Sequence, residues 1–153
     1  PSGIFRGIRV QTPDGALTVH GIDTGSPHIV QFVPDLKTVP VVHTGRMLRE
    51  HARFAPAGTN VNFVETLDTS VIAMRTYERG VENETLACGT GAVAAVLVAA
   101  QRKMVDSPAD VTVQSGETLR IYFMRQKESF REIYLEGRVK IVYQGYLFEE
   151  AYK

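Results

Sequence analysis

The chain has 153 residues, and its 17 Lys and Arg balance its 17 Asp and Glu, so its formal net charge is zero. A hydrophobic content of 44% with 22% charged residues excludes an intrinsically disordered chain and suits an ordinary folded core. The chain also lacks the overall positive charge that is typical of nucleic-acid-binding proteins. Its longest uncharged apolar run, residues 92–100, is about half of the ~18 residues that a membrane span requires. We therefore expect neither a nucleic-acid partner nor a membrane partner.

Cys88 is the only cysteine, so the chain cannot form an internal disulfide, which fits a reducing compartment such as the cytoplasm. The first residues show no basic segment followed by an apolar one, so no secretory signal is expected there. The chain starts with Pro1 rather than Met, and we expect it to be a processed or partial chain. Neither an internal repeat nor a linker interrupts it, which predicts a single domain over residues 1–153.

Runs of β-branched and aromatic residues predict that strands dominate the chain. Residues 13–15, Pro-Asp-Gly, have the composition of a hairpin turn between the first two runs. Asn60 and Asn62 alternate with Val61 and Phe63, which places both amides on one face of a strand and both apolar side chains on the other. The predicted strands contain residues 5–11, 17–22, 29–33, 60–63, 71–77, 111–114, 119–124, 132–136 and 139–143, the last four forming a meander.

Two segments have helical patterns. Residues 45–53 carry apolar side chains at helical spacing and end before Pro56, which predicts a short helix. Residues 92–104 predict a second helix, whose first nine residues are apolar on every side, so protein must surround it. A buried helix among many strands predicts an α+β fold, in which a curled, mostly antiparallel, barrel-like sheet surrounds a central helix.

The segment just before the apolar helix is the strongest candidate for chemistry. Cys88 lies at the start of this helix, where unpaired backbone N–H groups and the helix dipole favour an anion, including a thiolate. The glycines that flank it, at positions 89 and 91, allow a ligand carboxylate to approach these N–H groups closely. The alternative is a structural cysteine that packs as a small apolar residue.

Five other polar residues are weaker candidates when each is taken alone. His28 precedes a predicted strand, where a lone histidine is more often a solvated loop residue. Glu78 and Arg79 end another strand, either as an exposed ion pair or as groups lining the cleft that leads to Cys88. The Asn60 and Asn62 amides either face water or suit the ammonium and carboxylate groups of an amino acid.

Together these segments resemble the diaminopimelate epimerase family, with the match running from about residue 24 to residue 145. The resemblance rests on four blocks in the family's order: Thr24-Gly25-Ser26-Pro27-His28, Gly58-Thr59-Asn60-Val61-Asn62-Phe63-Val64, Arg75-Thr76-Tyr77-Glu78-Arg79-Gly80 and Glu84-Thr85-Leu86-Ala87-Cys88-Gly89-Thr90-Gly91-Ala92. The family interconverts LL- and meso-diaminopimelate, in lysine and peptidoglycan precursor synthesis, by moving the Cα proton between two cysteines. The resemblance therefore implies the family's fold and an epimerase without pyridoxal phosphate, another cofactor or a metal.

Carried over residue by residue, the resemblance implies a role for each matching position. Cys88 would be one of the two acid/base thiols, and His28 would support the reacting centre. Gly89 and Thr90 would bind the substrate carboxylate at the start of the helix. The remaining polar groups of the substrate would be held by Asn60, Glu78 and Arg79.

Two features depart from the family pattern. Ser26 stands where family members often have Asn, which leaves room for a racemase or isomerase of another amino acid. The family has two similar halves with one cysteine each, and this chain matches only the C-terminal half. We therefore expect the N-terminal half as a partner, or alternatively a homodimer in which two Cys88 helices face each other.

Two functions of other classes stay open from the sequence. A cysteine hydrolase would use Cys88 as nucleophile, His28 as base and Glu78 to orient the base. A binding domain would keep the fold and bind a ligand without turnover.

Overall fold

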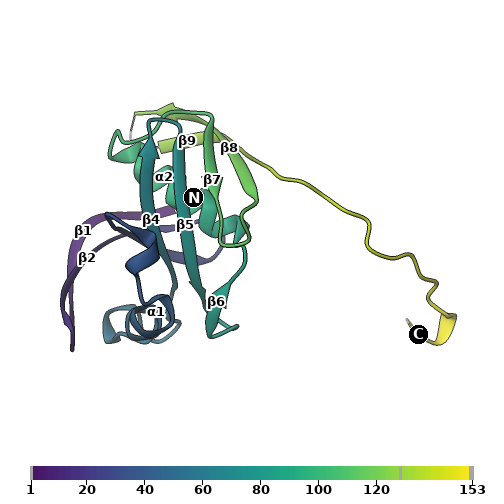
Figure 1. Cartoon of the computed structure of the whole chain (residues 1–153), viewed down its shortest axis with the longest axis horizontal. Coiled ribbons are helices and arrows are strands. Elements are labelled where there is room, and N and C mark those ends of the chain that lie inside the picture. The colour runs from purple at the N-terminus through teal and green to yellow at the C-terminus, as the bar shows by residue number, and fades with distance from the viewer. Residues whose placement is uncertain (1, 128, 152–153) are drawn as a thin grey trace.

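A computed structural model describes residues 2–127 and 129–151 and shows an α+β protein (Figure 1). Its two α-helices are α1 (Val41–Arg49) and α2 (Gly89–Gln101), and short 3-10 turns cover Leu36–Thr38, Ala52–Phe54 and Glu149–Ala151. The strands are β1 (Ser2–Thr12), β2 (Gly15–Asp23), β3 (Pro27–Phe32), β4 (Asn60–Asp68), β5 (Val71–Glu78), β6 (Asn83–Thr85), β7 (Ala109–Thr112), β8 (Thr118–Gln126) and β9 (Ser129–Glu136). The predicted strands before residue 137 are confirmed, except that β7 ends at Thr112 and leaves residues 113–114 of the predicted 111–114 strand outside it. β6 is an additional short strand.

The strands form one mixed sheet in the order β1-β2-β3-β4-β5-β7-β8-β9, with β6 paired to β5. Two pairs are parallel, β3 with β4 and β5 with β7, and the other pairs are antiparallel. The first hairpin turns where the Pro-Asp-Gly segment predicts it, since Thr12 pairs with Gly15. A barrel is not confirmed: in the described part of the chain no pairing joins β1 to β9, so the sheet stays open.

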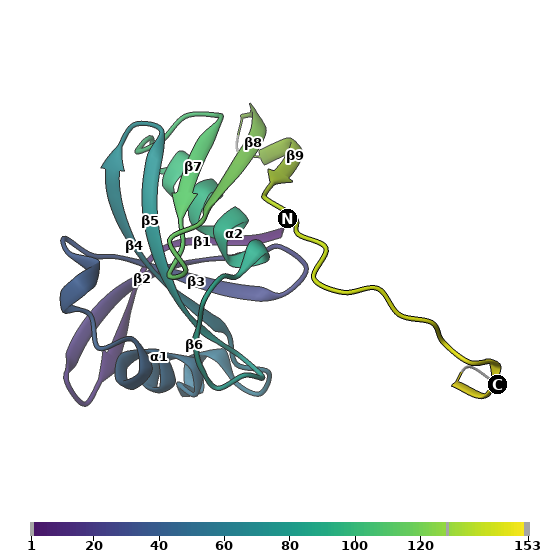
Figure 2. The same cartoon turned by 45° about the vertical axis from the view of Figure 1, so that its right-hand side comes forward.

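The helix α2 forms the centre of the larger of two hydrophobic cores, as its apolar sequence predicts. It contacts β2 and β3 toward one end of the sheet and β8 and β9 at the other, so strands from both ends pack against it (Figure 2). Ala95, Val96 and Leu97 in the middle of the helix have no exposed surface. The second core lies on the opposite face of β4 and β5, where α1 covers the sheet.

The helix α1 lies four residues earlier than the predicted 45–53 segment. It starts directly after Pro40, and it ends at Arg49. Gly45 therefore lies within the helix rather than at its start, packed directly against the ring of Tyr77 on β5. A Cβ at residue 45 would overlap this ring, so the glycine lets α1 lie close to the sheet.

The prediction of a final strand over residues 139–143 is wrong. After β9 the chain leaves the body of the protein as an extended segment without secondary structure as far as residue 148 (Figure 1). The side chains of this segment face solvent: Val139 is 91% exposed and Ile141 is 92% exposed. The alternating apolar pattern is typical of a strand, but a strand needs a neighbour, and among the described residues no strand pairs with this segment. In the described residues, no helix is long and apolar enough to cross a membrane.

Candidate active site

The candidate site lies at the N-terminus of α2, where Cys88 is the N-cap residue. Its backbone is extended, with φ −138° and ψ 106°, and its carbonyl accepts the N–H of Ala92 at 2.8 Å. The Cys88 side chain makes no capping hydrogen bond, and the residue is 8% exposed. Gly89 and Thr90 follow it and are exposed, so the first N–H groups of the helix are accessible to a ligand.

Gly91 brings this helix start close to the sheet. A Cβ at this position would lie 2.5 Å from Oδ1 of Asn62 and 3.1 Å from the Cys88 sulfur. Any side chain larger than hydrogen at residue 91 would therefore clash with Asn62 and crowd Cys88. The glycine here serves close packing between the helix and β4.

The register of three strands places polar side chains on the face of the sheet that carries α2. In the parallel pair, His28 lies beside Asn60, and in the next pair Asn62 lies beside Thr76. Because alternate residues share a face, Glu78 lies on this face as well. The opposite face carries the apolar partners of α1, such as Tyr77. The amide alternation of β4 in the sequence predicts this arrangement.

His28 is buried close to the start of α2, with 2% of its surface exposed. Its Nε2 atom lies 3.0 Å from Oγ of Ser26 and 3.1 Å from Oγ1 of Thr90, and its Nδ1 atom lies 3.2 Å from Nδ2 of Asn62. The pKa of His28 is lowered to about 4, mainly by burial; Asp23 opposes this shift, and Arg79 adds a smaller contribution in the same direction as burial. His28 is therefore a neutral imidazole near pH 7.

Thr90 links His28 to the thiol. Its Oγ1 atom lies 3.6 Å from the Cys88 sulfur, a distance that suits a hydrogen bond to sulfur. The Thr90 carbonyl also accepts a hydrogen bond from the hydroxyl of Thr24 at 3.1 Å, which fixes the start of the helix to the loop after β2. The structure thus brings Cys88, Thr90 and His28 together, with Ser26 beside them.

The Asn60 amide has structural partners on both sides. Its Nδ2 donates to the carbonyl of Pro27 at 3.1 Å, and its Oδ1 accepts the backbone N–H of Arg79 at 2.9 Å. The Arg79 guanidinium donates to the carbonyl of Ala57 at 3.2 Å. Asn60 therefore positions the segment that carries Glu78 and Arg79.

Glu78 and Arg79 do not form the exposed ion pair that is one interpretation of the sequence. Both residues are half-buried, and no salt bridge between them occurs in the described part of the chain. The Glu78 carboxylate makes no hydrogen bond to any residue that the structure describes. It is therefore available to a ligand.

The hydrogen bonds of a cysteine hydrolase are not assembled in this site. Among the described residues, none joins His28 to Cys88 directly, and none joins Glu78 to His28. A nucleophile, its base and the group that orients the base have to be hydrogen-bonded in that order. The imidazole of His28 contacts hydroxyl and amide groups instead.

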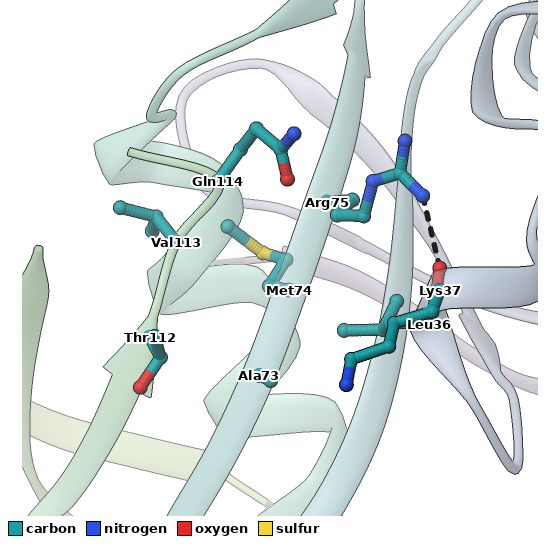
Figure 3. A pocket seen from close by; sticks show the side chains of 8 residues that line it. All are labelled: Leu36, Lys37, Ala73, Met74, Arg75, Thr112, Val113 and Gln114. Carbon is teal, nitrogen blue, oxygen red and sulfur yellow. Dashed lines mark hydrogen bonds between the residues drawn. The ribbon is translucent and has the colours of Figure 1, made fainter. Parts of the chain in front are cut away.

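Two pockets lie apart from the Cys88 thiol. One of about 390 Å³ opens between β5 and β7 (Figure 3), and its polar lining includes Lys37, Arg75 and Gln114. The Arg75 guanidinium is already engaged there, by Glu84 at 2.7 and 2.8 Å and by the carbonyl of Leu36 at 2.9 Å. A smaller pocket, of about 250 Å³, reaches His28 from the side of β1 and β2.

The sequence predicts Asn62 only as an amide on the same face as Asn60, and it gives no sign that Thr76 belongs to the site. Asn62 has no exposed surface and Thr76 is 2% exposed. Asn62 hydrogen-bonds to both Thr76 and His28. The signal available in the sequence was the amide alternation on β4, which places Asn62 on the same face as Asn60. In the described residues, no group of three His, Cys, Asp or Glu side chains is arranged to hold a metal ion.

A family profile and several relatives that match this chain carry the same name. The profile of the family described as diaminopimelate epimerase matches residues 21–142. Diaminopimelate epimerase of Aquifex aeolicus (strain VF5) is 45% identical over 95% of this chain and 56% of its own length. The protein of the same name from Chlorobaculum tepidum is 46% identical over 86% of this chain and 50% of its own length. That of Chlamydia muridarum is 43% identical over 79% of this chain and 44% of its own length.

The chain therefore spans about half the length of the curated relatives that it matches. Among solved structures, the phenazine biosynthesis protein of the PhzF family from Bacillus anthracis aligns with a TM-score of 0.48 and 18% identity. That alignment covers 86% of this chain and 38% of the other, and it is too remote to bear on the site.

Proposed function

The chain belongs to the diaminopimelate epimerase family, and from this premise we propose that it forms the C-terminal half of a cofactor-independent epimerase of LL- and meso-diaminopimelate. One observation carries the proposal. The only thiol of the chain lies at the N-terminus of a buried helix, next to exposed N–H groups and a buried hydrogen-bonded histidine. This arrangement suits proton transfer at the Cα atom of an amino acid.

The substrate α-carboxylate binds at the start of α2 in this proposal. The N–H groups of Gly89 and Thr90 donate to it, and the helix dipole stabilises its negative charge. The Cα–H bond is a weak acid, so deprotonation needs a carboxylate whose charge is already compensated and a base placed against the proton. Cys88 supplies that base on one face of Cα, and its thiol returns the proton in the reverse direction.

Glu78 and Arg79 hold the other polar groups of the substrate. The Glu78 carboxylate attracts an ammonium group, while the Arg79 guanidinium attracts a carboxylate. Asn60 acts one step away, because its amide holds the backbone of Arg79 at 2.9 Å. We therefore assign Asn60 to positioning rather than to direct contact with the substrate.

Inversion at Cα requires a second acid/base group on the opposite face, because one base alone returns the proton to the same face. The chain has a single cysteine. We do not assign the role of the second thiol to His28, since its Nε2 atom contacts Thr90, which also contacts the Cys88 sulfur, and its pKa is lowered to about 4. The second thiol then comes from the N-terminal half of the enzyme.

Exposed apolar side chains next to Cys88 support a missing partner half. Leu86, just before Cys88, is 69% exposed, and Leu135 on β9 is 44% exposed. A Cβ at Gly89 would lie 3.3 Å from Leu135, so this leucine borders the helix start. The extended segment after β9 adds seven exposed large apolar residues: Val139, Ile141, Val142, Tyr143, Tyr146, Leu147 and Phe148. Contiguous exposed apolar surface marks an interaction site.

Epimerisation of LL-diaminopimelate, followed by the appearance of the meso isomer, tests this proposal. We expect no inversion by the chain alone and inversion when the first half of the Aquifex aeolicus relative is supplied fused or separately. The same mixture with Cys88→Ala serves as the matched control and should be inactive. Inversion by the isolated chain would contradict the proposal that this chain carries only half of the active site, and it would favour the homodimer. Activity only with another amino acid would contradict diaminopimelate as the substrate.

A cytoplasmic location of the protein stays a prediction.

A further inference from the structure

Asn62 lies at the centre of a buried hydrogen-bond chain that ends at the Cys88 sulfur. The chain runs from Thr76 through Asn62, His28 and Thr90, and each pair is within hydrogen-bond distance. The first three residues are at most 2% exposed, so water does not supply alternative partners. The direction in which each bond donates then decides whether the sulfur receives a hydrogen bond.

The orientation of the Asn62 amide is fixed by a group that can only accept. Nδ2 lies 3.0 Å from the carbonyl oxygen of Ile29, and a carbonyl has no proton to give. This atom must therefore be the amide nitrogen, and Oδ1 accepts the hydroxyl of Thr76 at 3.0 Å. The second proton of Nδ2 points to Nδ1 of His28 at 3.2 Å. Both protons of the amide thus have acceptors.

This orientation decides the tautomer of His28. Because Nδ1 accepts from Asn62, the single proton of the neutral imidazole must sit on Nε2. Nε2 faces two hydroxyl oxygens, Ser26 Oγ at 3.0 Å and Thr90 Oγ1 at 3.1 Å. His28 is therefore a donor toward the site and has no lone pair available to take a proton from Cys88.

Thr90 completes the chain. When its oxygen accepts from His28, its own proton is free to turn toward the Cys88 sulfur at 3.6 Å. A hydroxyl donates more strongly to a thiolate than to a thiol, because charged acceptors make the stronger hydrogen bonds. We propose that Asn62 is a positioning residue, which holds His28 as the Nε2–H tautomer so that the chain of donors ends on the Cys88 thiolate.

The consequence for proton transfer at Cα rests on the proposed function, but the tautomer and the donor direction do not. Both can be measured on the chain without any substrate. A failure of the epimerase assay with an intact Nε2–H tautomer would remove the function and leave this inference. The opposite result would remove this inference and leave the function.

The first experiment reads the tautomer directly by nitrogen NMR of the chain with 15N-labelled histidine near pH 7. We expect Nε2 of His28 to be protonated and Nδ1 to be unprotonated in the unmodified protein. In Asn62→Asp, the carboxylate only accepts, so the proton should move to Nδ1 or the ring should become doubly protonated. Thr66→Val is the matched control, because the Thr66 hydroxyl on the same strand is buried and has no hydrogen-bond partner among the described residues. A protonated Nδ1 in the unmodified protein would overturn the proposal, whether or not Asn62→Asp folds.

The second experiment measures the rate at which iodoacetamide alkylates Cys88 near pH 7. Thr90→Val removes the last donor and should slow alkylation about fivefold, the effect of one ordinary hydrogen bond. Thr90→Ser keeps the hydroxyl and should restore the original rate. Thr90 is exposed, so neither substitution disturbs the core. Equal rates for the Val and Ser variants would show that the hydroxyl does not donate to the sulfur, and the proposal would fail.

Discussion

Acidification should destabilise the protein through His28, because this residue folds as a buried neutral imidazole. The pKa of His28 falls from 6.5 to about 4 on folding. A difference of this size corresponds to about 3 kcal/mol of unfolding free energy, at roughly 1.4 kcal/mol for each pH unit. That is a large part of the net stability of a small domain.

The direction of the effect follows from proton binding. Between pH 6.5 and about 4, the unfolded chain binds a proton at His28 and the folded protein does not. The contribution of His28 to the unfolding free energy is therefore fully present above pH 6.5 and is lost as the pH falls from 6.5 toward 4. Below about pH 4 no further loss comes from this residue. Urea unfolding at several pH values across this window measures the loss.

Two variants isolate His28 from the other acid-sensitive groups. His28→Gln removes the titration and should reduce the loss of stability by about 3 kcal/mol relative to the unmodified protein. His43→Gln should keep the full loss, because the His43 side chain is 62% exposed and lies at the surface, 2.7 Å from Asp14. Proton NMR of the imidazole gives an independent midpoint, expected at about 4. A midpoint near 6.5, or an unchanged slope in His28→Gln, would refute the reasoning.

Three further substitutions test the packing around the site, each by chemical denaturation. Val96→Asp places an unpaired carboxylate where no surface is exposed, so a cooperative unfolding transition should disappear. Gly91→Ala should cost about 1–3 kcal/mol, because the new Cβ overlaps the site, whereas Gly145→Ala has open space and should change little. Arg75→Met should cost about 2 kcal/mol, because it leaves a mostly buried carboxylate unpaired, whereas Arg120→Met breaks an exposed pair and should have a small effect.

The place of Cys88 could be predicted because it depends on local sequence. The apolar run of residues 92–100 identifies a buried helix without any knowledge of its partners, and Cys88 lies directly before it. The side of the sheet that carries Asn60 and Asn62 also follows from local alternation. Such features need only the period of a helix or a strand.

The partners of Asn62 could not be predicted, because they depend on pairing between distant strands. Asn62 meets His28 only because β3 and β4 are parallel, and a parallel pair requires a long crossover, here through α1. No local pattern fixes the register between two strands that are this far apart in the chain. The pairing of Asn62 with Thr76 depends on the register of the hairpin formed by β4 and β5, which is shifted by an irregularity between Thr66 and Asp68.

The segment of residues 139–143 shows the opposite failure. Its alternation indicates a local preference for the extended conformation. A strand forms from that preference only where a neighbouring strand offers a free edge. In the described residues no strand lies beside it, and Val139 stays 91% exposed. The pattern is understandable if the segment pairs with a partner half, as the proposed function expects.

The central claim is that Cys88 is one of two thiols on opposite faces of Cα, and isotope exchange tests it most directly. The measurement is deuterium wash-in from heavy water at Cα of LL- and meso-diaminopimelate, with Cys88→Ala in the chain assembled with an N-terminal half. The remaining thiol still serves one face, so we predict exchange with retention for one isomer, no exchange for the other and no inversion. Inversion by the Cys88→Ala assembly, or equal exchange from both isomers, would contradict the assignment.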